Sequence, residues 1–93
     1  METIRQEMIA LLSEAELDAM DLSRDLGIPE KEVYGHLSHI ARTVSVRGRR
    51  LVIRPARCLK CGYVFEDRKR FTRPGRCPCC RGTRLERPAY SIR

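Results

Sequence analysis

Five cysteines fall into two clusters in the second half of the chain. Cys58 and Cys61 enclose two residues, and after fifteen further residues the stretch RCPCCRG adds Cys77, Cys79 and Cys80. Paired cysteines with two intervening residues are typical of a four-thiolate zinc site, because each short turn brings both of its sulfurs to one metal. An odd number of cysteines also suits a metal site better than a disulfide framework.

The second cluster holds one cysteine more than a tetrahedral site needs. Cys77 with Cys80 repeats the spacing of the first pair, whereas Cys79 leaves one or no intervening residue to its neighbours. The spacing predicts four zinc ligands: Cys58, Cys61, Cys77 and Cys80. Cys79 is expected on the turn, facing away from the metal as a free thiol. Gly62 fits the position after the first pair, where the backbone often needs positive φ.

The chemistry expected of this site is structural. Four thiolates also hold iron, and the CGY and CPCC stretches resemble the metal-binding loops of rubredoxin. We expect zinc, because the basic surroundings and the few aromatic residues suit an electron carrier poorly. Four cysteine ligands leave no open position for water or substrate. No nucleophile with a base, phosphate loop or paired carboxylates stands out, so we expect no catalytic residues and no enzyme activity.

Charge divides the chain sharply. Residues 1–42 carry four basic and nine acidic side chains, a balance of −5. Residues 43–93 carry fifteen basic and three acidic ones, a balance of +12. A zinc ion with four thiolates lowers the second value by about two. So basic a segment attracts polyanions, and we expect nucleic acid as a partner.

The first forty residues predict three short helices that would position a nucleic-acid interface. Apolar side chains at helical spacing predict a helix over residues 3–12. Asp18 is expected to cap a second helix, which Gly27 ends. Pro29 suits the first position of a third helix. The core stripe of that helix is predicted to be Val33, Leu37 and Ile40.

Two β-rich stretches, TVSV at 43–46 and LVIR at 51–54, flank the basic loop RGRR and predict a hairpin. A helix, a glycine turn, a second helix and then a hairpin resemble a winged helix-turn-helix over residues 3–54. The fold class implied is α+β: three helices and a β-hairpin wing, followed by a small zinc ribbon with rubredoxin-like knuckles. A three-helix structural domain with an unrelated hairpin is the alternative.

Little helical periodicity remains beyond residue 55. YVF at 63–65 and RFT at 70–72 are expected to pair around a charged turn, and a last strand is expected within 85–92, interrupted at Pro88. The predicted core of this part is small: Val64, Phe65, Phe71, Leu85, Tyr90 and Ile92. So few apolar side chains rarely hold a domain together, and this explains why the ribbon needs a metal.

The predicted nucleic-acid contacts lie on the third helix and the wing. The second helix of a helix-turn-helix enters the major groove, while basic side chains around it contact phosphates. The predicted contact residues are Lys31, Tyr34, Ser38 and Arg42 on the helix and Arg47, Arg49 and Arg50 on the wing. Glu30 and Glu32 oppose binding at the start of the helix. We therefore expect the wing and the basic ribbon to supply most of the affinity.

The order of helices, wing and ribbon, together with CLKCGYVF and RCPCCRG, resembles a small family of predicted prokaryotic transcriptional regulators. These proteins fuse a winged helix-turn-helix to a rubredoxin-type zinc ribbon, and the resemblance covers nearly the whole chain. It implies a winged helix-turn-helix domain at 1–55, a zinc ribbon at 56–93, one structural zinc ion and duplex DNA as the partner.

Two alternatives stay open on the sequence. An RNA- or ribosome-binding module would share the basic ribbon, and an adaptor would use the ribbon to contact a transcription machine. The charged N-terminal stretch METIRQEMIA has no long apolar run, so we expect neither a signal peptide nor a membrane span, and a cytoplasmic location.

Overall fold

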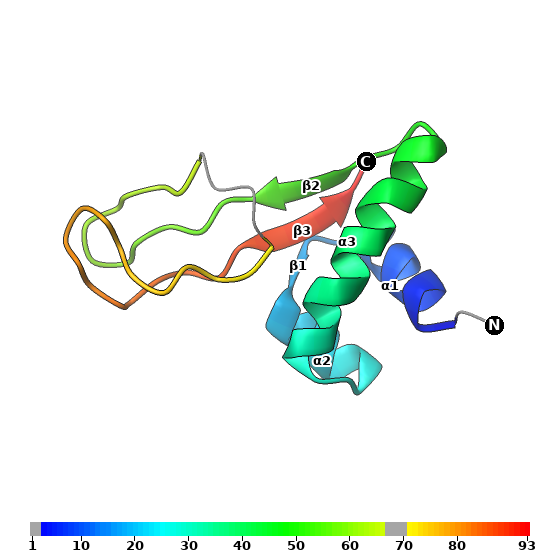
Figure 1. Ribbon diagram of the computed structural model, residues 1–93, viewed down its shortest axis with the longest axis horizontal. Helices are drawn as coiled ribbons and strands as arrows, with labels where there is room; N and C mark the ends of the chain where they lie inside the picture. The colour runs from blue at the N-terminus through cyan, green and yellow to red at the C-terminus, as the bar shows by residue number, and fades with distance from the viewer. Residues whose placement is uncertain (1–2, 67–70) are drawn as a thin grey trace.

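The computed structural model describes residues 3–66 and 71–93. Within them three helices and three short strands follow one another (Figure 1). The elements are α1 (Thr3–Glu14), β1 (Leu17–Asp18), α2 (Ala19–Leu26), α3 (Glu30–Val46), β2 (Leu51–Arg54) and β3 (Ala89–Ile92). The strands form one antiparallel sheet in the order β1-β3-β2. The predicted α+β class is confirmed at this level, and β1 is a strand that the sequence did not predict.

The turn between α2 and α3 follows from local caps. The Asp18 carboxylate accepts a hydrogen bond from the Asp21 N–H at 2.8 Å, and the Asp21 carboxylate accepts one from the Asp18 N–H at 3.3 Å. This reciprocal pair stabilises the start of α2, as predicted for Asp18. Gly27 ends the helix with φ +66°, a conformation that strains residues with a side chain. Pro29 directly precedes α3, one position earlier than predicted.

α3 continues through residues 43–46, the stretch predicted as the first strand of the wing. The buried stripe predicted at Val33, Leu37 and Ile40 extends to Val44, which is 1 % exposed, whereas Val46 is 89 % exposed. Keeping the helix buries Val44 in the same core, and this gain outweighs the strand preference of branched side chains. The predicted hairpin of residues 43–54 is therefore wrong.

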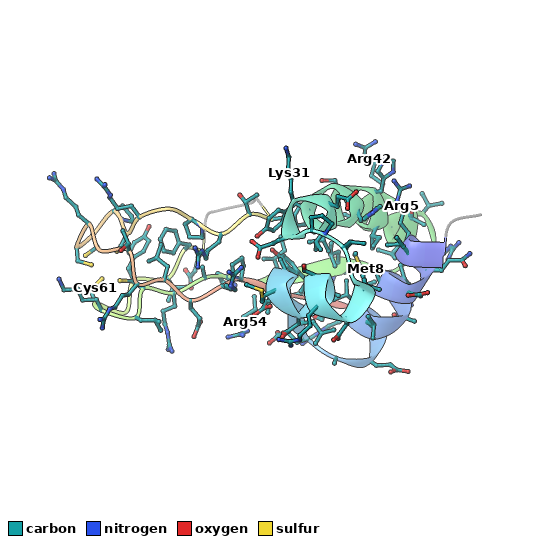
Figure 2. The ribbon with its side chains drawn as sticks, turned by 90° about the horizontal axis from the view of Figure 1, so that it is seen from below. Arg5, Met8, Lys31, Arg42, Arg54 and Cys61 are labelled. Atoms are coloured by element: carbon teal, nitrogen blue, oxygen red, sulfur yellow. The ribbon has the colours of Figure 1, made fainter. Side chains whose placement is uncertain are left out.

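β2 pairs instead with β3, which comes from the far end of the chain. The register places Ile53 opposite Tyr90 and Leu51 opposite Ile92, while β1 pairs with the other edge of β3. The three helices pack with this sheet around one core, and Met8, labelled among the helices in Figure 2, belongs to it. The buried members are Met8, Leu12, Ala19, Leu22, Val33, Leu37, Ile40, Val44, Tyr90 and Ile92. Tyr90 and Ile92 were predicted in the ribbon core, and this assignment is wrong because β3 belongs to the central sheet.

Residues 55–88, here called the cysteine arm, connect β2 to β3 and project from one end of the sheet (Figure 1). The predicted boundary after residue 55 falls where the chain leaves the sheet, and the chain returns to the same sheet at Ala89. The remainder, residues 1–54 and 89–93, is here called the helical part. No helix in the described ranges is long and apolar enough to cross a membrane.

A second, smaller core lies inside the arm. Its buried members are Ala56, Cys58, Phe65, Cys77 and Leu85. Val64, predicted in this core, is 38 % exposed, and Phe71 packs against the helical core instead.

The YVF segment of the arm pairs with residues 56–58 across the first cysteine turn, and its predicted pairing with RFT lies partly outside the described residues. Val64 forms a bridge with Arg57, and the Phe65 N–H donates to the Ala56 carbonyl at 3.0 Å. Most of the predicted turn between YVF and RFT lies outside the described residues, together with Arg68, Lys69 and Arg70.

Candidate metal centre and nucleic-acid interface

Two similar backbone turns position the cysteines. In the first, the Gly62 N–H donates to the Cys58 carbonyl at 2.9 Å and the Cys58 N–H donates to the Tyr63 carbonyl at 2.8 Å. In the second, the Arg81 N–H donates to the Cys77 carbonyl and the Cys77 N–H to the Gly82 carbonyl, both at 2.9 Å. The two turns therefore repeat one hydrogen-bond pattern with a shift of nineteen residues.

The turns bring four sulfurs to one point. The Sγ atoms of Cys58 and Cys80 are 3.6 Å apart, as are those of Cys61 and Cys77, and all four lie within 4.8 Å of one another. Ligands at a Zn–S distance of about 2.3 Å in a tetrahedron lie about 3.8 Å from each other. The four cysteines chosen by spacing are thus the four whose sulfurs meet, at separations that suit a metal ion such as zinc.

The residues that follow the second cysteine of each turn also share a backbone conformation with positive φ. Gly62 has φ +82° and Arg81, which follows Cys80 as Gly62 follows Cys61, has φ +60°. The prediction of positive φ at Gly62 is confirmed. The same repeat would have predicted it for Arg81, which adopts this conformation with a side chain and at a cost in free energy.

Backbone N–H groups near two of the sulfurs favour the thiolate form, which binds cations. The Cys61 N–H lies 3.5 Å from the Cys58 sulfur, and hydrogen bonding from it is the main cause that lowers the pKa of Cys58 to about 6, although burial acts in the opposite direction. Burial acts to raise the pKa of Cys77, but the N–H groups of Cys80 and Cys79 hold it below the ordinary value.

The other two thiols retain their protons more strongly. The Tyr63 N–H lowers the pKa of Cys61, but burial and the neighbouring sulfurs outweigh it and raise this pKa to about 12. A metal cation that binds here therefore replaces protons shared among the four sulfurs.

Cys79 lies outside this group. It is exposed, and its N–H points at the Cys77 sulfur at 3.4 Å. The backbone of Cys79 thus supports the site, while its thiol faces solvent as expected for a free thiol.

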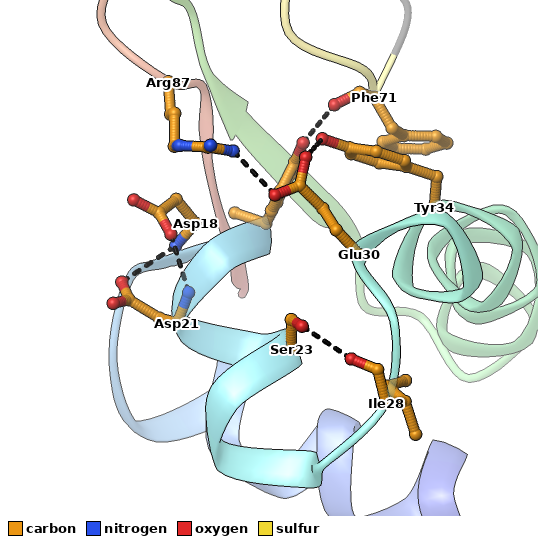
Figure 3. A network of polar contacts seen from close by, with 9 residues as sticks. Asp18, Asp21, Ser23, Ile28, Glu30, Tyr34, Phe71 and Arg87 are labelled. Carbon is orange, nitrogen blue, oxygen red and sulfur yellow. Dashed lines mark hydrogen bonds and ion pairs between the residues drawn. The ribbon is translucent and has the colours of Figure 1, made fainter.

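The arm is fixed to the helical part by a polar cluster at the first turn of α3 (Figure 3). Arg87 of the arm donates to the Glu30 carboxylate at 2.9 Å, and the Tyr34 hydroxyl donates to the other oxygen of that carboxylate at 2.8 Å. Beside them the buried Tyr90 hydroxyl donates to the Phe71 carbonyl, and the two rings meet edge to face. Burial and the Glu30 carboxylate raise the pKa of Tyr34 to about 12.

A second set of ion pairs lies where the arm leaves the sheet, and one of them, Arg54 with Glu86, joins the arm to the helical part. Arg54, at the end of β2, pairs with Glu16 at 2.8 Å and with Glu86 at 3.6 Å. Arg57 pairs with the same Glu86 at 3.5 Å. The sequence offered no signal for these pairings or for Arg87 with Glu30, because the partners are far apart along the chain.

The seven predicted nucleic-acid contacts separate into two places. Lys31, Ser38 and Arg42 are exposed on α3, and Lys31 and Arg42 point away from the core on the same side of the molecule (Figure 2). Tyr34 is half-buried, with its hydroxyl bound to Glu30.

The three arginines assigned to the wing occupy the turn between α3 and β2. Arg49 donates to the Ser13 hydroxyl at 3.2 Å, and the Arg50 backbone pairs with Arg93 at the end of the chain. This turn lies at the end of the sheet opposite the arm (Figure 1). The assignment of Arg47, Arg49 and Arg50 to a hairpin wing is therefore wrong, because helix α3, not a strand, directly precedes them.

Assigning β3 and this turn to the helical part also changes the distribution of charge. The helical part contains nine basic and nine acidic residues and is neutral. The arm contains ten basic and three acidic residues, a balance of +7 that equals the formal charge of the whole chain. The polyanion-attracting surface is consequently the arm.

Comparisons with known proteins agree with this architecture. A family model described as PF0610-like, N-terminal matches residues 3–52. The solution NMR structure of protein PF0610 from Pyrococcus furiosus is similar over 98 % of this chain and 89 % of that one, with 32 % sequence identity and a TM-score of 0.82. A comparison with curated proteins gave no match.

Proposed function

The chain belongs to the PF0610-like family, and on that premise we propose that it is a DNA-binding transcriptional regulator of the winged helix-turn-helix kind, in which the cysteine arm replaces the wing. In this reading α2 and α3 form the helix-turn-helix, and β2 and β3 are the strands that follow it. The arm is the connection between those strands, where a wing would be.

One observation carries the proposal: the segment that holds the whole net charge is bound to the first turn of α3. Arg87 neutralises Glu30, one of the two acids that oppose the approach of α3 to phosphates. Lys31 and Arg42 remain exposed on the helix. Phosphate contacts supply register and most of the affinity, and a few groove contacts add specificity.

In this proposal one zinc ion, held by Cys58, Cys61, Cys77 and Cys80, is structural. Four thiolates fill its coordination sphere, so it holds the basic arm in shape and performs no reaction. The ion and its thiolates lower the charge of the arm from +7 to about +5. The proposal therefore includes no enzyme activity.

The test is a selection of bound fragments from a random duplex DNA library at physiological salt, with zinc-loaded protein. Enrichment of one sequence motif is expected. Reversal of the exposed arm charges Arg76 and Arg81 to glutamate should abolish binding, whereas reversal of Arg47 and Arg50 at the opposite end should weaken it less. Tighter binding of structured RNA than of any duplex would instead favour the RNA-binding alternative, and absence of nucleic-acid binding would favour a protein adaptor.

A further inference from the structure

A cleft of about 510 Å³ opens between the two cysteine turns, on the surface of the arm. Its lining residues are Leu59, Lys60, Gly82, Thr83 and Arg84. The Leu59 N–H donates to the Arg84 carbonyl at 2.9 Å, and Cys58 bridges to Leu85. Backbone pairing thus brings Lys60 and Arg84, far apart in sequence, to the same cleft.

Gly82 lines the cleft between Lys60 and the second cysteine turn. A Cβ atom at Gly82 would lie 3.6 Å from Cδ of Lys60 and 3.3 Å from the Cys80 sulfur. The stem of Lys60 thus lies beside the second cysteine turn, and the closer neighbour of Gly82 is the Cys80 sulfur.

The two cations of the cleft differ from the arginines at the base of the arm. Arg57 and Arg87 are neutralised by Glu86 and Glu30. Lys60 and Arg84 form no ion pair with any residue that the structure describes, and the cleft has no acidic lining residue. Two cations without an ion pair among the described residues, together with Thr83, thus line one space.

We propose that this cleft binds a phosphate group. A guanidinium offers a planar fork of donors and an ammonium a compact charge, a combination that suits phosphate oxygens. The proposal rests on the proposed function, because the phosphate in question is that of a nucleic-acid backbone in contact with the arm. The same chemistry would accept a free phosphoanion, and the experiment separates the two sources.

The experiment follows backbone amide shifts of zinc-loaded, ¹⁵N-labelled protein during titration with duplex DNA and, separately, with inorganic pyrophosphate. The amides of Lys60, Thr83 and Arg84 should shift in both titrations. Binding of duplex without movement of these amides would refute the cleft and leave the proposed function intact. Movement with pyrophosphate in a protein that binds no duplex would uphold the cleft and refute the proposed function. If neither ligand moves them, the cleft is refuted.

Variants supply a second measurement. Lys60→Ala and Arg84→Ala should each lower the slope of log K against log salt by about 1, which corresponds to an affinity loss of about eightfold at 0.1 M salt relative to 1 M. An unchanged salt slope in both the Lys60→Ala and the Arg84→Ala protein, each with stoichiometric zinc, would mean that the cleft does not bind phosphate.

Discussion

Removal of the metal should weaken the helical part without unfolding it. The arm spans 34 residues, from the end of β2 to the start of β3. While a metal fixes the arm, those strands are joined as if by a short turn. When the arm unfolds, the same strands are joined by a flexible loop of its full length. The β2–β3 pairing then has to close a longer loop, and this lowers the free energy of unfolding of the helical part.

The size of this effect follows from the loop lengths. From a turn of about four residues to 34 is about three doublings, each of which costs about 0.6 kcal/mol, so the loss is about 2 kcal/mol. For a part of about 60 residues this lowers the midpoint of thermal unfolding by roughly 8–16 °C. The helices themselves remain folded, because none of the ten buried core residues comes from the arm and Phe71 is the one hydrophobic residue of the described arm that packs against them.

Thermal unfolding followed by the helical circular dichroism signal, with zinc or with a chelator, measures this shift. The matched control is a variant in which an Asn-Gly turn joins Arg54 directly to Ala89, since such a turn closes a hairpin without the arm. Its midpoint should not respond to chelator. Loss of the helical signal at 25 °C on chelation, or an unchanged midpoint in the full chain, would refute the loop-closure reasoning.

Four further outcomes are expected. Arg81→Gly should stabilise the zinc-loaded arm by about 1 kcal/mol in chelator competition, because glycine adopts φ +60° without strain; weaker zinc retention would contradict this. Tyr90→Phe should cost about 1–2 kcal/mol in urea unfolding, since the Phe71 carbonyl loses its donor while the ring stays in place; a cost near zero would show that water replaces the hydroxyl. Cys79→Ser protein should bind one zinc ion like the native chain; a substoichiometric metal content would mean that the wrong pair was chosen. Protons compete with the metal for the thiolates, so zinc affinity should fall as the pH falls, and more steeply below about pH 6, where Cys58 of the metal-free site also becomes protonated; an affinity that does not change between pH 7.5 and 5, read with a zinc indicator, would contradict the assignment.

Local sequence signals were reliable wherever the cause was local. The Asp18 cap and the Gly27 stop of α2 follow from hydrogen bonding and backbone sterics within a few residues, and both were predicted. The four-cysteine grouping was likewise predictable, because the spacing within each pair fixes the geometry of its own turn. The positive φ at Arg81 could have been found from the same repeat.

The wrong predictions concern secondary structure and strand pairing that depend on contacts with residues far apart in the chain. TVSV has the composition of a strand, but Val44 lies on the buried stripe of α3, so the core keeps it helical. LVIR is a strand as predicted, and only the folded chain shows that its partner is β3. The residues of a strand do not by themselves indicate which other strand completes its hydrogen bonds.

The sequence by itself thus determined the three helices, the grouping of the cysteines and the excess of positive charge in the second half of the chain, because spacing and composition act over short distances. The tertiary structure decided where that charge lies. Pairing of β3 with β1 and β2 returns the end of the chain to the helical part, leaves the net charge on the arm and brings Arg87 to Glu30 on α3. These results depend on contacts between residues far apart in the chain. Such contacts stabilise the structure only once the core has brought the residues together.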